Sequence, residues 1–219
     1  MQPDYDATTA LIVVDVQNDF ADPAGSLSVA GGDRIVPYVN AQIAAALDAG
    51  AFVAYTQDWH PPSTPHFVTA GGPWPVHCVA GTWGAAFHPA LTRDAGPSVR
   101  KGANGEDGYS GFTMRDAGTG DSVPTELVGL LRAHGIRRVV VCGLATDYCV
   151  RDTALDAIAL GYATSVPLEG VRAVDVRPGD GEAALAELAA AGAVLIPASA
   201  SAAVDQVTSF VSTAPGPVA

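Results

Sequence analysis

Three side chains that could form one catalytic group lie at or just after the ends of predicted strands: Asp15, Lys101 and Cys149. They offer a proton carrier, a cation and a nucleophile. Cys149 lies in the first turn of a predicted helix, where the helix dipole lowers the pKa of a thiol and backbone N–H groups can hold an oxyanion. Partial desolvation at a strand end can raise the pKa of Asp15 toward that of a general base. Taken singly, Cys149 could be a structural cysteine and Asp15 a loop cap.

Lys101 is unusual because it is the only lysine in the chain. The other ten of the 11 basic residues are arginine, in a composition rich in Ala and Gly. A site that needs a compact ammonium, which Arg cannot mimic, is one reason for a lysine to stand here. Chance is the alternative reading.

A second cluster of side chains could bind a metal ion. Asp58 and His60 alternate along an extended segment, which places both on one side of the chain. His66 and His77 follow within the Pro-, Gly- and Trp-rich stretch 60–97, and long irregular stretches are usually functional. Imidazole and carboxylate suit Zn²⁺, Fe²⁺ or Mn²⁺, with positions left open for water or substrate. The alternative is a set of surface histidines in a Pro-rich loop.

Three aromatic residues, Phe20, Trp74 and Tyr109, come from the same segments as the catalytic and metal-binding candidates. Together they could form the walls of a flat slot for a planar ring. Each taken alone could equally be part of the hydrophobic core.

The elements that must position these residues alternate between strands and helices along the chain. Apolar runs predict strands at 10–15, 51–58, 98–102, 137–144, 162–168 and 193–197. Helical patterns predict helices at 33–49, capped by Asp33, at 123–134, with Pro124 in the first turn and Gly135 after the last, at 147–160 and at 180–192. The tail after residue 199 could end in a short helix.

This alternation predicts an α/β fold with three α/β/α layers and a mostly parallel sheet of about six strands. The carboxyl ends of parallel strands meet at one rim, where active sites of such sheets lie. We therefore expect Asp15, Asp58, Lys101 and the segment 143–149 to converge there.

The composition indicates one globular domain, 1–219, with 48% hydrophobic and 16% charged residues. A net charge of −12 argues against nucleic-acid and membrane partners. The acidic N-terminus does not resemble a signal peptide, and no apolar run has the length of a membrane span, so we expect a cytoplasmic protein. Three irregularly spaced cysteines argue against a disulfide framework. A homo-oligomer remains open.

Seven segments between about residues 10 and 165 resemble, in order, the nicotinamidases within the isochorismatase-like cysteine hydrolases. They are VDVQNDF, DWHPPSTPHF, WPVHCVAGT, GAAFHP, RKG, GYSGF and GLATDYCVRDTALDA. The Asp-x-His pattern of the second segment distinguishes nicotinamidases from metal-free relatives. The acidic segment 104–107 departs from the family pattern, and residues 170–219 carry no family motif.

The resemblance implies the isochorismatase-like hydrolase fold, with a metal-binding loop at about 58–88. It assigns the site residues as a catalytic triad of Asp15, Lys101 and Cys149, metal ligands Asp58, His60, His66 and His77, oxyanion-hole N–H groups of Ala145 and Cys149, and substrate contacts Phe20, Trp74, Tyr109 and Leu144. It also implies a cis peptide between Leu144 and Ala145.

The activity implied by the resemblance is hydrolysis of nicotinamide to nicotinate and ammonia in NAD salvage, through a thioester on Cys149. Pyrazinamide is an expected second substrate. One divalent metal ion, zinc first and iron or manganese as alternatives, would bind the pyridine nitrogen. A related amidase acting on another small amide or ureido compound is the alternative enzyme. A non-catalytic nucleotide-binding module is disfavoured, because the chain has neither G-x-G-x-x-G after its first strand nor a P-loop.

Overall fold

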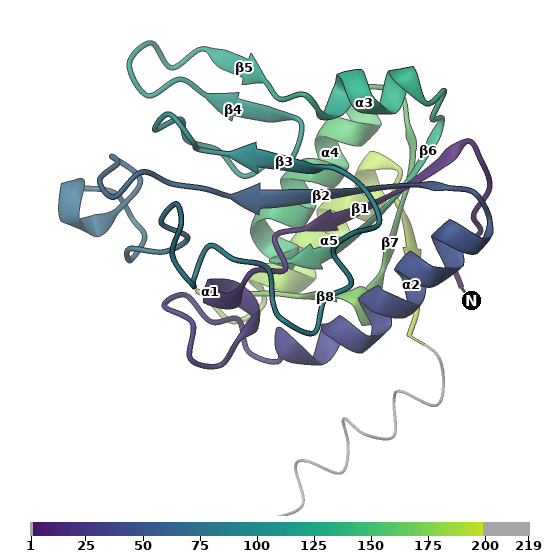
Figure 1. The fold of residues 1–219 in the computed structure, drawn as a ribbon, viewed down its shortest axis with the longest axis horizontal. Helices are drawn as coiled ribbons and strands as arrows, with labels where there is room; N and C mark the ends of the chain where they lie inside the picture. The colour runs from purple at the N-terminus through teal and green to yellow at the C-terminus, as the bar shows by residue number, and fades with distance from the viewer. Residues whose placement is uncertain (1, 199–219) are drawn as a thin grey trace, which may run out of the picture.

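A seven-stranded sheet forms the centre of the molecule in the computed structural model, which describes residues 2–198 (Figure 1). The possible helix after residue 199 lies outside the described residues. The strand order is β3-β2-β1-β6-β7-β9, with β8 beside β6, and every pair is parallel. The strands are β1 (Thr9–Val14), β2 (Phe52–Asp58), β3 (Ser98–Lys101), β6 (Arg138–Leu144), β7 (Ala163–Pro167), β8 (Val171–Arg172) and β9 (Val194–Ile196).

Helices cover both faces of the sheet, as the apolar strands require. Alternate residues of β1 enter opposite hydrophobic clusters: Leu11 packs on the side of α2 (Val36–Asp48), and Ile12 on the side of the other long helices. Those helices are α3 (Leu127–Ala133), α4 (Arg151–Ala159) and α5 (Asp180–Ala191). Short helices α1 (Asn18–Ala21) and a 3-10 turn (Asp33–Ile35) precede α2. The predicted three-layer α/β/α fold is confirmed.

The prediction of a helix start at Pro124 is wrong. Pro124 ends β5 (Ser122–Pro124), which pairs antiparallel with β4 (Thr113–Arg115) in a separate small sheet. Thr125 fixes this change of direction, because its backbone N–H donates to Phe112 O and its hydroxyl donates to Gly111 O. Strands of three residues are too short to produce a readable hydrophobic alternation.

Asp33 begins the 3-10 turn, and no side-chain capping hydrogen bond is formed at that helix start. Gly135 follows α3 at a φ of +64°, as predicted for a residue that ends a helix. Helix boundaries elsewhere differ from the predicted ones by a few residues, except that 147–160 divides into a π-helix (Thr146–Val150) and α4.

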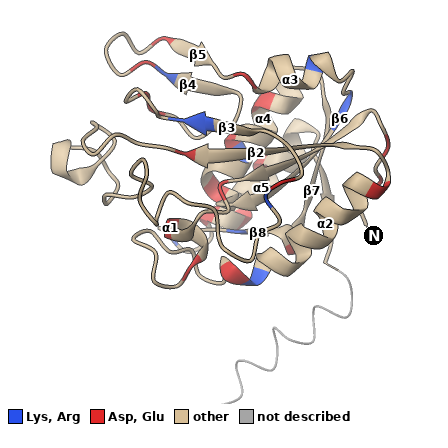
Figure 2. Cartoon of the chain, in the orientation of Figure 1, with Lys and Arg blue, Asp and Glu red and all other residues tan. Residues whose placement is uncertain are grey.

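The carboxyl ends of four neighbouring strands lie side by side at one rim. Asp58 and Lys101 are register partners at the ends of β2 and β3, and Figure 2 shows the acidic tip of β2 beside the basic end of β3. Asp15 follows β1 with a φ of +47°, and Leu144 ends β6. The sheet order therefore positions the predicted site. Among residues 2–198, no helix is both long and apolar enough to cross a membrane.

Candidate active site

Lys101 is the centre of the candidate catalytic group. Its Nζ lies 2.7 Å from Asp15 Oδ2, 2.9 Å from Asp58 Oδ1 and 3.4 Å from Cys149 Sγ, and it also donates to Tyr109 O at 3.0 Å. The side chain is completely buried. The structure thus brings together the nucleophile, the carboxylate and the cation that the sequence places on three strand ends.

Neighbouring side chains hold the two carboxylates in position. The Thr56 hydroxyl donates to Asp15 Oδ1 at 2.6 Å. Gln17 clamps the backbone of Asp58, because its Oε1 accepts from Asp58 N–H at 2.8 Å and its Nε2 donates to Asp58 O at 2.7 Å. Sequence reasoning did not identify Thr56 or Gln17 as site residues, although Gln17 lies in the VDVQNDF segment.

Burial is the largest cause of the pKa shift of Asp15 and also acts on the pKa of Lys101. It raises the pKa of the Asp15 carboxyl above its usual value, although the Lys101 ammonium partly opposes this. Burial also lowers the pKa of Lys101, but Asp15 and Asp58 more than compensate and keep the ammonium charged. Asp15 is therefore suited to accept and return a proton beside a fixed positive charge.

The predicted lowering of the Cys149 thiol pKa is wrong. Burial raises this pKa well above its ordinary value; Lys101 opposes the rise, while Asp15 and Asp58 add to it. Cys149 lies in the π-helix rather than in the first turn of an α-helix. The thiol consequently retains its proton at rest and needs a base to become a thiolate.

A cluster of three buried histidines and one aspartate lies beside the catalytic group. The ring nitrogens of His60, His66 and His77 include a set in which all lie within 4.8 Å of one another. The Nε2 atoms of His60 and His77 lie 3.7 and 3.8 Å from Asp58 Oδ2. The structure therefore brings together all four predicted metal ligands.

The hydrogen bonds of these histidines fit a divalent metal. His77 Nδ1 lies 2.7 Å from Pro75 O and His66 Nδ1 lies 2.7 Å from an oxygen of Asp107, so each ring can present Nε2 to the cluster. Both ring nitrogens of buried His60 are without a hydrogen-bond partner. An unsatisfied buried polar group calls for a ligand, and a donor set of three imidazoles and one carboxylate suits zinc-like ions.

A narrow cavity of about 30 Å³ joins the metal cluster to the nucleophile. All four predicted substrate contacts line it: Phe20, Trp74, Tyr109 and Leu144. Trp74 Nε1 donates to the Tyr109 hydroxyl at 2.9 Å.

Three residues that line the narrow cavity, Leu27, Tyr148 and Val174, escaped sequence reasoning. Tyr148 packs edge-on against Trp74, with ring centroids 4.9 Å apart, and its position next to Cys149 was a usable signal. Val174 belongs to the part of the chain without family motifs. It is held by Asp147, whose carboxylate accepts from the N–H groups of Val174 and Asp175, each at 2.9 Å.

The backbone next to the nucleophile has the predicted form. The Leu144–Ala145 peptide bond is cis. Ala145 and Cys149 both line the narrow cavity. Their N–H groups therefore remain our candidates for the oxyanion hole.

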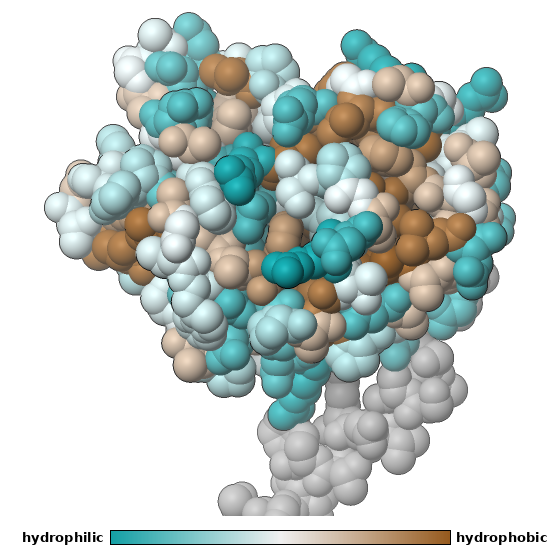
Figure 3. Space-filling view, in the orientation of Figure 1, coloured by the Kyte–Doolittle hydropathy of each residue, from teal (hydrophilic) through white to brown (hydrophobic). Residues whose placement is uncertain are grey.

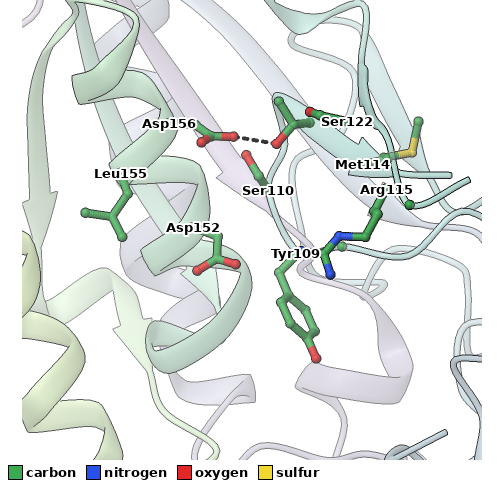
Figure 4. A pocket seen from close by; sticks show the side chains of 11 residues that line it. Tyr109, Ser110, Met114, Arg115, Ser122, Asp152, Leu155 and Asp156 are labelled. Carbon is green, nitrogen blue, oxygen red and sulfur yellow. Dashed lines mark hydrogen bonds between the residues drawn. The ribbon is translucent and has the colours of Figure 1, made fainter. Parts of the chain in front are cut away.

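A larger cavity of about 570 Å³ lies on the other side of Tyr109, between the β4–β5 hairpin and α4. Figure 4 shows Asp152 and Asp156 of α4 facing this space from one side and Arg115 from the other. Tyr109 is the only predicted site residue that lines it. Its ring thus lies between the narrow cavity and the larger one.

Comparison with known proteins agrees with this geometry. The model of the isochorismatase domain family matches residues 9–200. A nicotinamidase from Escherichia coli is 39% identical, over 85% of this chain and 93% of its own length. A pyrazinamidase from Pyrococcus horikoshii, solved in complex with zinc, has a TM-score of 0.77 at 40% identity, covering 87% of this chain and 99% of that one. The L. infantum protein PnC1, solved in complex with nicotinate, has a TM-score of 0.79 at 41% identity, covering 87% and 93%.

Proposed function

The chain belongs to the isochorismatase family, and we propose that it is a nicotinamidase, which hydrolyses nicotinamide to nicotinate and ammonia as a step of NAD salvage. The single observation that carries the proposal is one cavity lined by Cys149, by the metal-ligand candidates Asp58, His66 and His77, and by aromatic rings. A pyridine carboxamide needs all three, since its ring nitrogen, ring faces and amide carbon must be held at once. Likeness to a nicotinamidase and to a protein solved in complex with nicotinate supports the proposal.

The chemical steps follow from the positions of three side chains. Asp15 takes the thiol proton of Cys149, and the thiolate forms a bond to the amide carbon. The backbone N–H groups of Ala145 and Cys149 hold the oxyanion. As the C–N bond breaks, Asp15 returns the proton to the leaving ammonia. Water, deprotonated by Asp15, then attacks the thioester, and the acid leaves as Cys149 regains its proton.

Lys101 acts through charge in each of these steps. Its ammonium lies within 3.4 Å of both the nucleophile and the general base. It stabilises the thiolate when that forms, and it prevents Asp15 and Asp58 from repelling each other. Lysine fits this position better than arginine because a compact ammonium can contact three groups in a fully buried space.

Asp58, His60, His66 and His77 would hold one divalent metal ion, for which we propose zinc on the strength of the donor set. When bound, the ion supplies a positive centre that orients the pyridine nitrogen of the substrate. Pyrazinamide offers the same ring nitrogen and carboxamide, so we propose it as a second substrate. We propose that the whole site belongs to a single domain whose metal-binding loop covers about 58–88.

The test is ammonia release from nicotinamide by zinc-loaded protein, with Cys149→Ala and Cys142→Ala compared. Cys142 is a matched control, because it is buried in the core and does not line the cavity. Release should vanish in Cys149→Ala and persist in Cys142→Ala. Persistence in Cys149→Ala would show that the nucleophile is misassigned. If the wild type released no ammonia from nicotinamide but turned over a ureido compound, nicotinamide would be refuted as the substrate.

A further inference from the structure

We propose that Asp107 positions the ring of His66 and sets the metal affinity of the site, an inference that rests on the proposed metal site. Asp107 belongs to the acidic segment 104–107. It contributes no atom to the histidine cluster and does not line the narrow cavity. Its role would therefore be exerted entirely through His66.

The contact is a short hydrogen bond between His66 Nδ1 and Asp107 Oδ1, at 2.7 Å. A carboxylate at this distance accepts the ring proton and so fixes it on Nδ1. The lone pair is then on Nε2, which is available to the metal. A carboxylate partner also makes the imidazole a more basic ligand than a neutral partner does.

The three histidines differ in this respect. The Nδ1 atom of His77 faces a neutral backbone carbonyl, that of Pro75. Neither ring nitrogen of His60 has a hydrogen-bond partner, although its Nε2 lies 3.7 Å from Asp58 Oδ2. Asp107 thus provides the negatively charged outer partner of the histidine cluster. We therefore expect removal of the Asp107 carboxylate to lower the metal affinity, although Asp107 is not one of the proposed ligands.

Asp107 is itself held in place from two directions. Its Oδ1 also accepts from Gly108 N–H at 2.8 Å. Its backbone pairs with that of Arg115 in β4, with Asp107 N–H donating to Arg115 O at 2.8 Å. The β4–β5 hairpin therefore acts as the support that fixes the carboxylate relative to His66.

The exposure of the pair makes the proposal testable without damage to the fold. The His66 side chain is 4% exposed, whereas that of Asp107 is 52% exposed. Truncation of Asp107 leaves no core cavity, so the fold of Asp107→Ala should remain intact. The melting temperature of the metal-free variant, compared with that of the metal-free wild type, checks this.

The experiment measures zinc affinity directly, by titrating chelator-stripped protein with Zn²⁺ against a chromophoric competitor. Asp107→Ala should raise the Kd for zinc by about 10–100-fold. Asp107→Asn keeps an acceptor oxygen without the charge, so its Kd for zinc should lie between those of the wild type and Asp107→Ala. The control is Glu106→Gln, because the Glu106 carboxylate contacts Asn104, at 2.9 Å, and not His66. It removes one charge from the same segment and should leave the Kd unchanged.

Four results decide the proposal. A Kd for Asp107→Ala equal to that of the wild type would overturn it, as would an equal loss of affinity in Glu106→Gln. Failure of the wild type to bind zinc would overturn it together with the metal site. A selective loss in Asp107→Ala would support it even if nicotinamide proved not to be the substrate, because zinc affinity and ammonia release are measured separately. Added zinc should then restore turnover of Asp107→Ala.

Discussion

Replacing Lys101 with methionine tests the electrostatic account of the site most directly. Methionine has nearly the length of lysine but no charge, so the Asp15 and Asp58 carboxylates lose a cation that lies 2.7 and 2.9 Å away. Removing one partner of a buried ion pair costs about 3–5 kcal/mol, because the remaining charge stays buried without compensation. This is a large part of the roughly 5–15 kcal/mol that stabilises an ordinary domain.

The loss should depend on pH in a direction that can be worked out. Burial already raises the pKa of Asp15 in the folded protein, and loss of the Lys101 charge removes a cause that lowers it. The folded variant then retains a proton that the unfolded chain releases. Stability is therefore greatest below the unfolded carboxyl pKa and falls as the pH rises through that value toward the raised folded pKa. Lys101→Met should thus lose more stability at pH 8 than at pH 5.

The assay is urea unfolding of metal-free protein at both pH values, with Arg100→Met as control. Arg100 is the adjacent cation on β3, but it is exposed and lies over the Trp59 ring. Both variants contain the same histidines, so the contribution of histidine titration cancels in the difference between their free energies of unfolding. The reasoning is refuted if Lys101→Met is as stable as Arg100→Met at pH 8, or if the gap between them widens as the pH falls.

The remaining predictions concern the base, the metal and the ring slot. The Asp15→Asn variant should keep the native fold, because the Thr56 hydroxyl can still donate to the amide oxygen. Its kcat in steady-state ammonia release should be about 10²–10⁴ times lower than that of the wild type. An unchanged kcat would exclude Asp15 as the base. Stripping the metal with a chelator should abolish turnover and lower the Tm, and zinc should restore both; retention of full turnover in verified metal-free protein would contradict the ring-orienting role. Trp74→Phe removes the hydrogen bond to the Tyr109 hydroxyl, which is worth about 0.5–1.5 kcal/mol. This variant should raise KM for nicotinamide more than it lowers kcat. The control Trp83→Phe, at an exposed position, should change neither KM nor kcat.

The positions of the reactive groups could be predicted because parallel strands leave little freedom. Asp15, Asp58 and Lys101 end neighbouring strands, so the sheet order alone brings them together. The four metal-ligand candidates could be predicted for a similar reason, since three of them lie in one irregular loop after a strand end. Val68 in that loop is 55% exposed. Figure 3 shows apolar surface on this side of the molecule among hydrophilic patches. The shape of the loop could not be predicted from residue types.

What sequence reasoning missed depends on contacts between distant segments. The pKa of Cys149 rises because the folded chain buries the thiol, and helix position alone does not reveal this. Val174 reaches the cavity wall only because Asp147 accepts hydrogen bonds from a loop 27 and 28 residues further along the chain. The contact between Asp107 and His66 spans 41 residues. No local pattern encodes such pairings.

The segment 107–109 has a consequence for engineering this scaffold. Asp107 contacts the metal-ligand candidate His66, the Tyr109 ring lines the narrow cavity, and the Tyr109 carbonyl accepts a hydrogen bond from Lys101. Through Asp107 and Tyr109, this three-residue segment therefore touches the parts of the site that would govern ion preference, ring width and base strength. An insertion or a grafted loop here would shift all three traits together, so a designer should exchange the segment with its β4–β5 support as one module.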